Sequence, residues 1–101
     1  MKTFFERENL RYAMIGSGSW ATALIKLLLN HQESIGWYLR DEKKIEQVRK
    51  TAHNPFYLQS VHLDPDRLHM STDINEIVSN ADVLVFCTPS AYFMRVMSNL
   101  N

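Results

Sequence analysis

Gly16-Ser17-Gly18-Ser19-Trp20-Ala21 is a glycine-rich turn between two apolar segments, and it decides the fold of this chain of 101 residues. The chain has three glycines, and two of them lie in this turn. The run before it, Leu10–Ile15, is rich in residues that favour strands. After the turn, apolar residues recur at the spacing of one helix face, at Trp20, Ala23, Leu24, Leu27 and Leu28. A strand, a G-x-G-x-x-A turn and a helix in this order predict a dinucleotide-binding unit.

The positions of the turn have separate physical roles in such a unit. Gly16 lets the chain turn tightly out of the strand, Gly18 lets the backbone approach a pyrophosphate, and Ala21 lets the helix pack closely. We expect Ser19 to be the helix N-cap, because a serine oxygen can accept a hydrogen bond from an unpaired N–H group. Trp20 fits two interpretations, a core position at the start of the helix or a residue beside the ligand. The alternative for the whole turn is a structural connection that binds nothing.

The middle of the chain predicts a second strand and a second helix. Ser34–Leu39 has strand character, and Asp41 after it is expected to cap the next helix. Ile45 and Val48 are the few apolar positions of that helix, so the rest of its surface is expected to be charged and exposed. Residues 53–69 contain two prolines and mixed polar residues, which predicts a long irregular connection.

The last third of the chain predicts a further strand–helix–strand unit. His69–Ser71 is a short strand candidate, and Thr72 or Asp73 is expected to cap a helix, with Glu76 as the partner in a capping box. The apolar face of this helix is expected at Ile74, Ile77, Val78 and Ala81. Val83–Cys87 is continuously apolar, as expected of a parallel strand that is buried on both faces.

Alternating strands and helices predict an α/β chain with a Rossmann-like parallel sheet and flanking helices. Pro89 and Ser90 are expected to end the last strand and open a helix. The chain then has about four strands, which makes the sheet incomplete, a part of a larger domain. We therefore expect residues 1–9 to be a polar leader and residues 10–101 to be the N-terminal part of a dinucleotide-binding domain. The loops beyond the carboxyl ends of the strands are the candidate site loops: residues 16–21, 40–41 and 88–92.

Composition excludes several classes of function. The formal net charge is +0 at pH 7, so the chain lacks the basic surface with which proteins bind nucleic acid or anionic membranes. No segment has the pattern of a signal peptide or the length of a membrane span. Cys87 is the single cysteine, which favours a reducing cytoplasmic location and a buried, unreactive thiol. The four histidines lack the spacing of a metal site, and we expect none.

The end of the second predicted strand carries two residues that argue for different cofactors. Arg40 is placed to stack on adenine or to bind a 2′-phosphate through its guanidinium group. Asp41 is placed to accept hydrogen bonds from the ribose hydroxyls, and a carboxylate there would repel a phosphate. Asp41 also has its simpler role as a helix cap, and Arg40 has that of a solvated surface charge. The sequence favours NADP(H) slightly over NAD(H).

Several segments together resemble one known family, the N-terminal domain of NAD(P)-dependent glycerol-3-phosphate dehydrogenase. The segments that carry the resemblance are Ile15–Leu24, Trp37–Asp41, Asn54–Leu58, Ser71–Asp73, Ala81-Asp82 and Pro89-Ser90. The resemblance implies an enzyme that uses NADH or NADPH to interconvert dihydroxyacetone phosphate and sn-glycerol 3-phosphate, a precursor of phospholipids. Its partners would be the dinucleotide and this small phosphorylated substrate.

The resemblance also implies which residues contact the cofactor. The turn supplies Gly16, Ser17, Gly18, Ser19 and Trp20, and the adenosine end of the cofactor meets Arg40 and Asp41. Tyr57 would cover the cofactor, while Pro89, Ser90 and Tyr92 would border the nicotinamide. The family's catalytic lysines lie beyond residue 101, partly in a separate helical substrate domain. We therefore expect no catalytic residue in this chain and no turnover by the chain alone.

Two other functions fit the same residues. One is a module that senses NAD(H) or NADP(H) and regulates a partner without catalysis. The other is a related reductase that acts on hydroxy acids, against which the serine-tryptophan pair of the turn argues. An incomplete sheet exposes a strand edge, so association into a homodimer is a further expectation.

Overall fold

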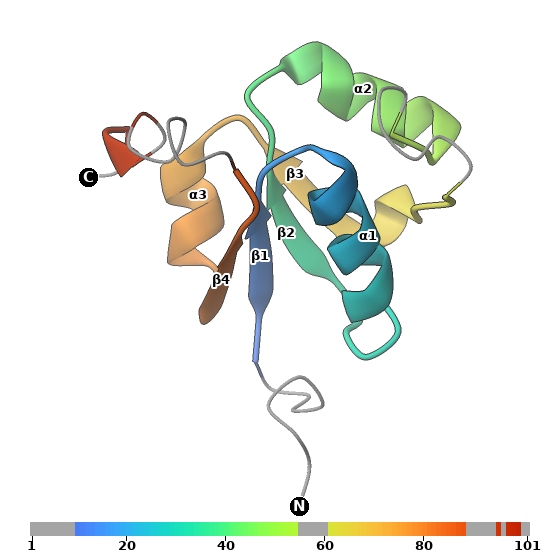
Figure 1. The fold of residues 1–101 in the computed structure, drawn as a ribbon, viewed down its shortest axis with the longest axis horizontal. Helices are drawn as coiled ribbons and strands as arrows, with labels where there is room; N and C mark the ends of the chain where they lie inside the picture. The colour runs from blue at the N-terminus through green and yellow to red at the C-terminus, as the bar shows by residue number, and fades with distance from the viewer. Residues whose placement is uncertain (1–9, 55–60, 89–94, 96, 100–101) are drawn as a thin grey trace, which may run out of the picture.

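The computed structural model describes residues 10–54, 61–88, 95 and 97–99. Within them a four-stranded parallel sheet has helices on both faces (Figure 1). The strands are β1 (Tyr12–Ile15), β2 (Ile35–Tyr38), β3 (Leu68–Ser71) and β4 (Val83–Phe86). Their order in the sheet is β3-β2-β1-β4, and every neighbouring pair is parallel. The predicted Rossmann-like sheet is confirmed.

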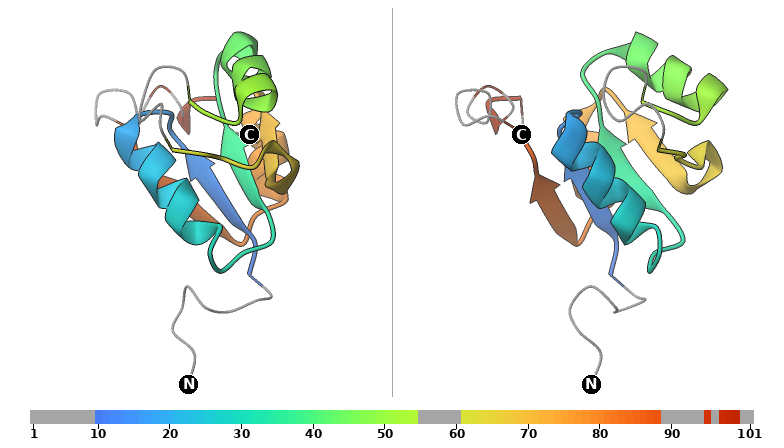
Figure 2. Two further views of the ribbon diagram at one scale, coloured as in Figure 1. Left: turned by 90° about the vertical axis from the view of Figure 1, so that its right-hand side faces the viewer. Right: turned by 45° about the vertical axis from the view of Figure 1, so that its right-hand side comes forward.

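The helices follow the strands as the sequence predicts. They are α1 (Ser19–Leu28), α2 (Glu42–Thr51) and α3 (Ile74–Ser79), and a short 3-10 helix, η2 (Pro65–Arg67), precedes β3. Figure 2 shows α1 and α2 on one side of the sheet and α3 on the other. The predicted leader and the predicted last helix fall mainly outside the described residues.

Alternating residues of the central strand serve two separate cores. Tyr12 and Met14 pack in the larger core with residues of α1 and α2, while Ala13 and Ile15 pack in the smaller core beneath α3. This alternation follows from the period of two along a strand. Because β1 is buried on both faces, the position of the turn that follows it is fixed by both cores.

The apolar face predicted for α1 is correct at Leu28 and in part at Leu24, which packs against the core, but it is wrong at Trp20 and Leu27. Trp20 is 79% exposed and Leu27 is 59% exposed, so the interpretation of Trp20 as a core residue is also wrong. The residues that are buried on this helix are Ala21, Thr22, Ile25 and Leu28. Nearly every position from 21 to 29 is apolar, so periodicity alone does not select the buried face.

Two predicted features of β4 and its surroundings need correction. The strand was expected to be buried on both faces, but all four of its residues are half-buried, because β4 is an edge of the described sheet. Cys87, expected to be fully buried, is half-buried as well. Burial still raises the pKa of its thiol, which keeps the thiol protonated near neutral pH.

The predicted helix caps are correct in two helices and wrong in one. Asp41 caps α2 by accepting a hydrogen bond from the Lys43 N–H group at 2.9 Å. Asp73 caps α3, and its Oδ1 accepts from the N–H groups of Asn75 and Glu76. In α1 the N-cap is Gly18 rather than the predicted Ser19, and no side chain caps it.

Only half of the predicted capping box of α3 forms: Asp73 Oδ1 accepts from the Glu76 N–H group, but the Glu76 carboxylate does not bind back to the Asp73 N–H group. The Asp73 N–H group donates to Ser71 Oγ at 2.9 Å, which takes the place of the Glu76 carboxylate. Glu76 Oε2 instead lies 3.0 Å from His69 Nε2. The Asp73 N–H group is therefore satisfied by Ser71, the last residue of β3. This residue lies outside the four-residue capping-box motif.

Candidate functional site

The carboxyl ends of the strands form one edge of the sheet, and the turn after β1 and the connection after β2 lie there beside the end of β4 (Figure 1). From β1 the chain proceeds outward to β2 and β3, then returns to add β4 on the other side of β1. The direction of the strand order therefore reverses between β1 and β4. Open α/β sheets bind ligands in the crevice at such a reversal.

Gly16 is required at this edge by the protein itself. Its φ is +136°, a conformation that residues with a side chain rarely adopt. A Cβ atom at Gly16 would lie 2.4 Å from the Cys87 carbonyl oxygen. The Cys87 N–H group also donates to the Ile15 carbonyl at 2.8 Å. The first glycine therefore lets the end of β1 pass directly against the end of β4.

Gly18 has no such requirement. A Cβ atom built there would meet nothing within 4 Å, and its φ of −80° is open to any residue. Among the described residues, no atom beyond its chain neighbours lies within 4 Å of that position. A glycine that nothing in the described chain demands, beside a helix N-terminus, matches the role of the second glycine as the point where a pyrophosphate approaches the backbone.

The N-terminus of α1 differs from those of α2 and α3 in that no side chain of the described residues caps it by a hydrogen bond. Its first N–H groups have no partners inside the helix, as in every α-helix, and the helix dipole places partial positive charge there. No acidic residue lies in the first turn of α1, whereas α2 has Glu42 and α3 has Glu76. An anion such as a phosphate is the natural complement of an end of this kind.

Three side-chain donors hold the carbonyl groups of the turn. Trp37 Nε1 donates to the Gly16 carbonyl at 2.6 Å. The carbonyls of the next two residues, Ser17 and Gly18, accept from Asn54 Nδ2 at 3.0 Å and from Thr22 Oγ1 at 2.9 Å. Sequence reasoning assigned no role to these three donors. Thr22 lies four residues after Gly18, and threonine hydroxyls commonly donate to the carbonyl four residues earlier. No spacing rule in the sequence points to Trp37 or Asn54.

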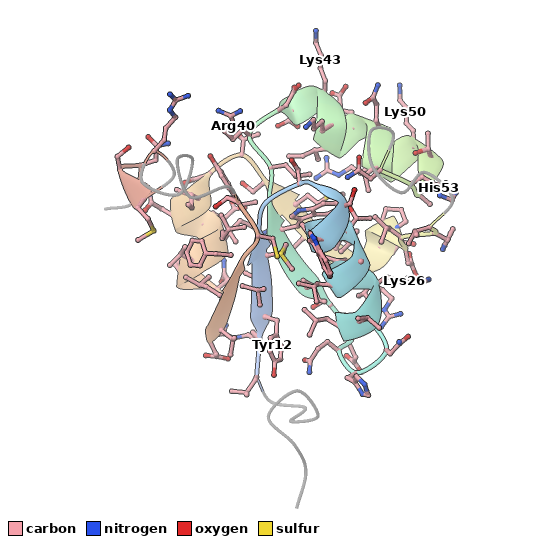
Figure 3. All side chains as sticks on the ribbon, viewed as in Figure 1. Tyr12, Lys26, Arg40, Lys43, Lys50 and His53 are labelled. Carbon is pink, nitrogen blue, oxygen red and sulfur yellow. The ribbon has the colours of Figure 1, made fainter. Side chains whose placement is uncertain are left out.

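Arg40 and Asp41 lie at the same edge, between the end of β2 and the start of α2. Both are exposed, and Figure 3 shows Arg40 at the connection that leaves β2. Asp41 Oδ1 is engaged with the Lys43 N–H group, so the capping role foreseen for it is present. Trp20, the second residue of α1, lies beside the turn with its side chain exposed. The other predicted contact residues, Tyr57, Pro89, Ser90 and Tyr92, lie outside the described residues.

The opposite edge of the sheet, at the amino ends of the strands, has polar and charged side chains around a hollow. The hollow, of about 350 Å³ on the α3 side, is lined by residues at the amino ends of the strands, among them Arg11, Ser34 and His69. Asp82 joins the starts of β1 and β4 there, and its hydrogen bonds to Arg11 hold the pKa of its carboxyl below the usual value. This hollow is remote from the glycine turn, and the candidate site does not include it.

No group of three or more histidine, cysteine, aspartate or glutamate side chains is arranged to hold a metal ion in the described part. None of the helices in that part is both long and apolar enough to cross a membrane.

Comparison with known proteins places the turn and the edge around it in a family. A family model described as the N-terminus of NAD-dependent glycerol-3-phosphate dehydrogenase matches residues 11–101. A glycerol-3-phosphate dehydrogenase (NAD(P)+) of Nitratidesulfovibrio vulgaris is 33% identical over 91 residues, which are 90% of this chain and 27% of that protein. One of Agathobacter rectalis is 37% identical over 82 residues, 81% of this chain and 24% of that protein.

A solved structure shows the same fold. The crystal structure of glycerol-3-phosphate dehydrogenase from Coxiella burnetii aligns with a TM-score of 0.74 and 22% identity, over 88% of this chain and 27% of that one. The chain thus spans about a quarter of the length of the relatives that it matches. With the family model covering nearly the whole sequence, this chain belongs to the family of NAD-dependent glycerol-3-phosphate dehydrogenase N-terminal domains.

Proposed function

We propose that this chain binds the dinucleotide cofactor of a glycerol-3-phosphate dehydrogenase, with the pyrophosphate over Gly18 and the N-terminus of α1. The observation that carries the proposal is the contrast within the turn. Gly16 is required by its contact with the Cys87 carbonyl, whereas Gly18 has open space beside an uncapped helix N-terminus. Family membership supports the same assignment.

The adenosine end of the cofactor would reach the carboxyl end of β2. Arg40 lies there, and its guanidinium group suits a 2′-phosphate because it presents several donors in one plane. The Asp41 carboxylate already accepts a hydrogen bond as the cap of α2. This supports Arg40 as the residue that discriminates, and a modest preference for NADPH over NADH.

The complete enzyme would interconvert dihydroxyacetone phosphate and sn-glycerol 3-phosphate and so feed phospholipid synthesis. The bound nicotinamide would supply or accept the hydride, and the residues that hold and protonate the substrate would lie beyond residue 101. Tyr57, Pro89, Ser90 and Tyr92 would complete the cofactor site on the side of the nicotinamide. We propose a cytoplasmic location, where the thiol of the single cysteine stays reduced.

Calorimetric titration of the chain with NADPH and NADH at matched salt tests the proposal. We expect saturable one-to-one binding, and about tenfold weaker NADPH binding in Arg40→Ala with NADH nearly unchanged, as for loss of one charge-assisted contact. Lys50→Ala is the matched control, because it removes an exposed cation from the last turn of α2 (Figure 3). Binding of neither nucleotide by the folded chain would overturn the proposal, and tighter NADH binding would overturn the cofactor preference.

A longer product of the same gene tests the reaction. It is expected to oxidise NADPH when dihydroxyacetone phosphate is added. Failure to reduce this substrate, with cofactor binding intact, would overturn the substrate assignment and leave the cofactor site standing.

A further inference from the structure

We propose that Asn54 is a positioning residue for the cofactor. Its carboxamide, together with the Trp37 indole and the Thr22 hydroxyl, orients the peptide groups of the glycine turn so that their N–H groups face the pyrophosphate. The inference rests on the proposed function and adds to it a residue from a distant part of the chain.

The carbonyl groups of Gly16, Ser17 and Gly18 are consecutive, and each accepts a hydrogen bond from one of these three side chains. In a trans peptide the C=O and N–H bonds point in opposite directions, and the described part of the chain has no cis peptide. A carbonyl that is held against the protein therefore turns the N–H group of the next residue away from it.

The N–H groups affected are those of Ser17, Gly18 and Ser19. Within the described residues, no hydrogen bond joins any of these three groups to another protein atom. Ser19 begins α1, so its N–H group is one of those that the helix itself leaves unpaired. Successive backbone N–H groups directed to the same side form a concave anion-binding surface.

Among the three donors, Asn54 is distinguished by a side-chain nitrogen that donates two hydrogen bonds. It is 3% exposed, and its Nδ2 donates to both the Ser17 carbonyl and Thr22 Oγ1, each at 3.0 Å. A carboxamide nitrogen has two hydrogens, and a hydroxyl group both accepts and donates. The Thr22 hydroxyl thus accepts from Asn54 and passes its own hydrogen to the Gly18 carbonyl. The Gly18 carbonyl also accepts from the Thr22 N–H group at 3.0 Å, as the first hydrogen bond of α1. Asn54 therefore holds the Ser17 carbonyl directly and supports the orientation of the next peptide group through the Thr22 hydroxyl.

The consequence for binding is pre-organisation. If the Ser17–Gly18 peptide rotated, its carbonyl oxygen would face the phosphate in place of its N–H group, and the two would repel each other. Holding the productive orientation in the unliganded protein lowers the free-energy cost of binding. Asn54 would therefore act on that part of a ligand which lies over the turn and not on its adenosine end.

Two ligands separate these parts: ADP-ribose, which contains the pyrophosphate, and adenosine 2′-monophosphate, which lacks it. In NMR titrations of the full chain, Asn54→Ala is expected to weaken ADP-ribose binding about tenfold, as for loss of a net hydrogen-bond contribution. It is expected to leave adenosine 2′-monophosphate binding within about twofold, because that ligand has no group over the turn.

Matched variants keep the test specific. Asn80→Ala also removes a carboxamide that donates to a backbone carbonyl, that of Glu76 at 2.9 Å, but at the end of α3. It is expected to change neither affinity. Thr22→Val removes the hydroxyl at nearly constant volume and is expected to reproduce the loss seen in Asn54→Ala, while Thr22→Ser keeps the hydroxyl and is expected to restore most of the affinity for ADP-ribose.

The outcomes distinguish the inference from the proposed function. If the wild-type chain binds ADP-ribose and Asn54→Ala binds it equally well, the inference is overturned and the cofactor site stands. Equal losses for both ligands in Asn54→Ala would show a general structural role and would also overturn it. If the wild-type chain binds neither ligand, the proposed function fails and the inference fails with it.

Discussion

The two ends of α1 differ in whether side chains of the described residues hydrogen-bond to the backbone groups that the helix leaves unpaired there. At its C-terminal end, Arg67 Nη2 donates to the carbonyls of Leu29 and Gln32, and Nε donates to that of Glu33 at 3.0 Å. At its N-terminal end the cap is a glycine, and no side chain accepts from the helix N–H groups. Every helix leaves unpaired groups at both ends. Here the described residues satisfy the carbonyls at the C-terminal end, and the N–H groups at the N-terminal end are those that we propose a ligand satisfies.

The largest expected effect comes from a substitution in the turn that leads from β1 to the N-terminal end of α1. Gly16→Ala would place a methyl group 2.4 Å from the Cys87 carbonyl at a φ of +136°. We expect a loss of about 4 kcal/mol in the free energy of unfolding, since backbone strain and overpacking act together. Urea denaturation measures it, and a midpoint equal to that of the wild type would contradict the account of the first glycine.

The next largest effect is expected from removing the side chain that binds backbone carbonyls at the C-terminal end of α1. Arg67→Ala would remove the guanidinium group from the carbonyl of Leu29, the C-cap of α1, and from the carbonyls of Gln32 and Glu33 in the turn that follows. The group is also a cation near the negative end of the helix dipole. We expect a loss of about 2 kcal/mol in the free energy of unfolding, as for hydrogen bonds to a charged group. Dinucleotide affinity in the folded variant is expected to be unchanged, and a selective loss of affinity would contradict the division between the two ends.

A third substitution sharpens the comparison by giving the N-terminal end a cap. Gly18→Ser places a favourable N-cap residue at a φ that it readily adopts, in space where a Cβ atom meets nothing. We expect stability to be unchanged or raised by about 0.5 kcal/mol, because serine and glycine differ little as caps. The side chain would occupy the space of the pyrophosphate, so NADPH affinity is expected to fall about tenfold.

The two effects of Gly18→Ser are measured by urea denaturation and calorimetry on one preparation. Loss of both stability and affinity would mean that Gly18, like Gly16, is required by the fold. Unchanged affinity would place the ligand elsewhere.

The arrangement of elements was predictable from the sequence, and the complete buried face of α1 was not. The positions of β1, β2 and the Asp41 cap follow from local patterns that a window of a few residues contains. The buried face of α1 does not, because apolar residues surround the helix. Ser19 was a reasonable cap by residue type, but the chain enters α1 with Gly18 in the cap position.

The sequence predicted the glycine turn of the candidate site, but it did not predict the side chains that hydrogen-bond to the carbonyls of the turn. The glycine pattern marks the turn for two reasons. Gly16 is required by its close contact with the Cys87 carbonyl, and Gly18 is the position at which we propose that the pyrophosphate approaches the backbone. Trp37 and Asn54 hold the carbonyl groups of the turn through hydrogen bonds across 21 and 37 residues of sequence. Pairing at such separations depends on the complete fold, and no spacing rule contains it.

The smallest effect concerns the far edge of the sheet and its pH dependence. Because the pKa of Asp82 is lowered in the folded chain by its hydrogen bonds to Arg11, its ionised form stabilises the fold at neutral pH. This contribution is lost as pH falls through the lowered pKa. Asp82→Asn is therefore expected to be less stable than the wild type at neutral pH, with the difference shrinking in acid.

Urea midpoints of both proteins from about pH 6 to about pH 3 measure this, the range in which aspartate groups titrate. A difference that grows on acidification would contradict the sign. Dinucleotide affinity at neutral pH is expected to be equal in the two proteins, which separates this edge from the glycine turn.

The central claim is that the uncapped end of α1 receives the pyrophosphate, and amide chemical shifts of the 15N-labelled chain test it most directly. Titration with ADP-ribose is expected to shift the N–H signals of Ser17, Gly18 and Ser19 most, and those of Asn75 and Glu76 in the capped first turn of α3 hardly at all. Saturable binding whose largest shifts fall at the hollow beside Arg11 and His69, with the turn unchanged, would contradict the account.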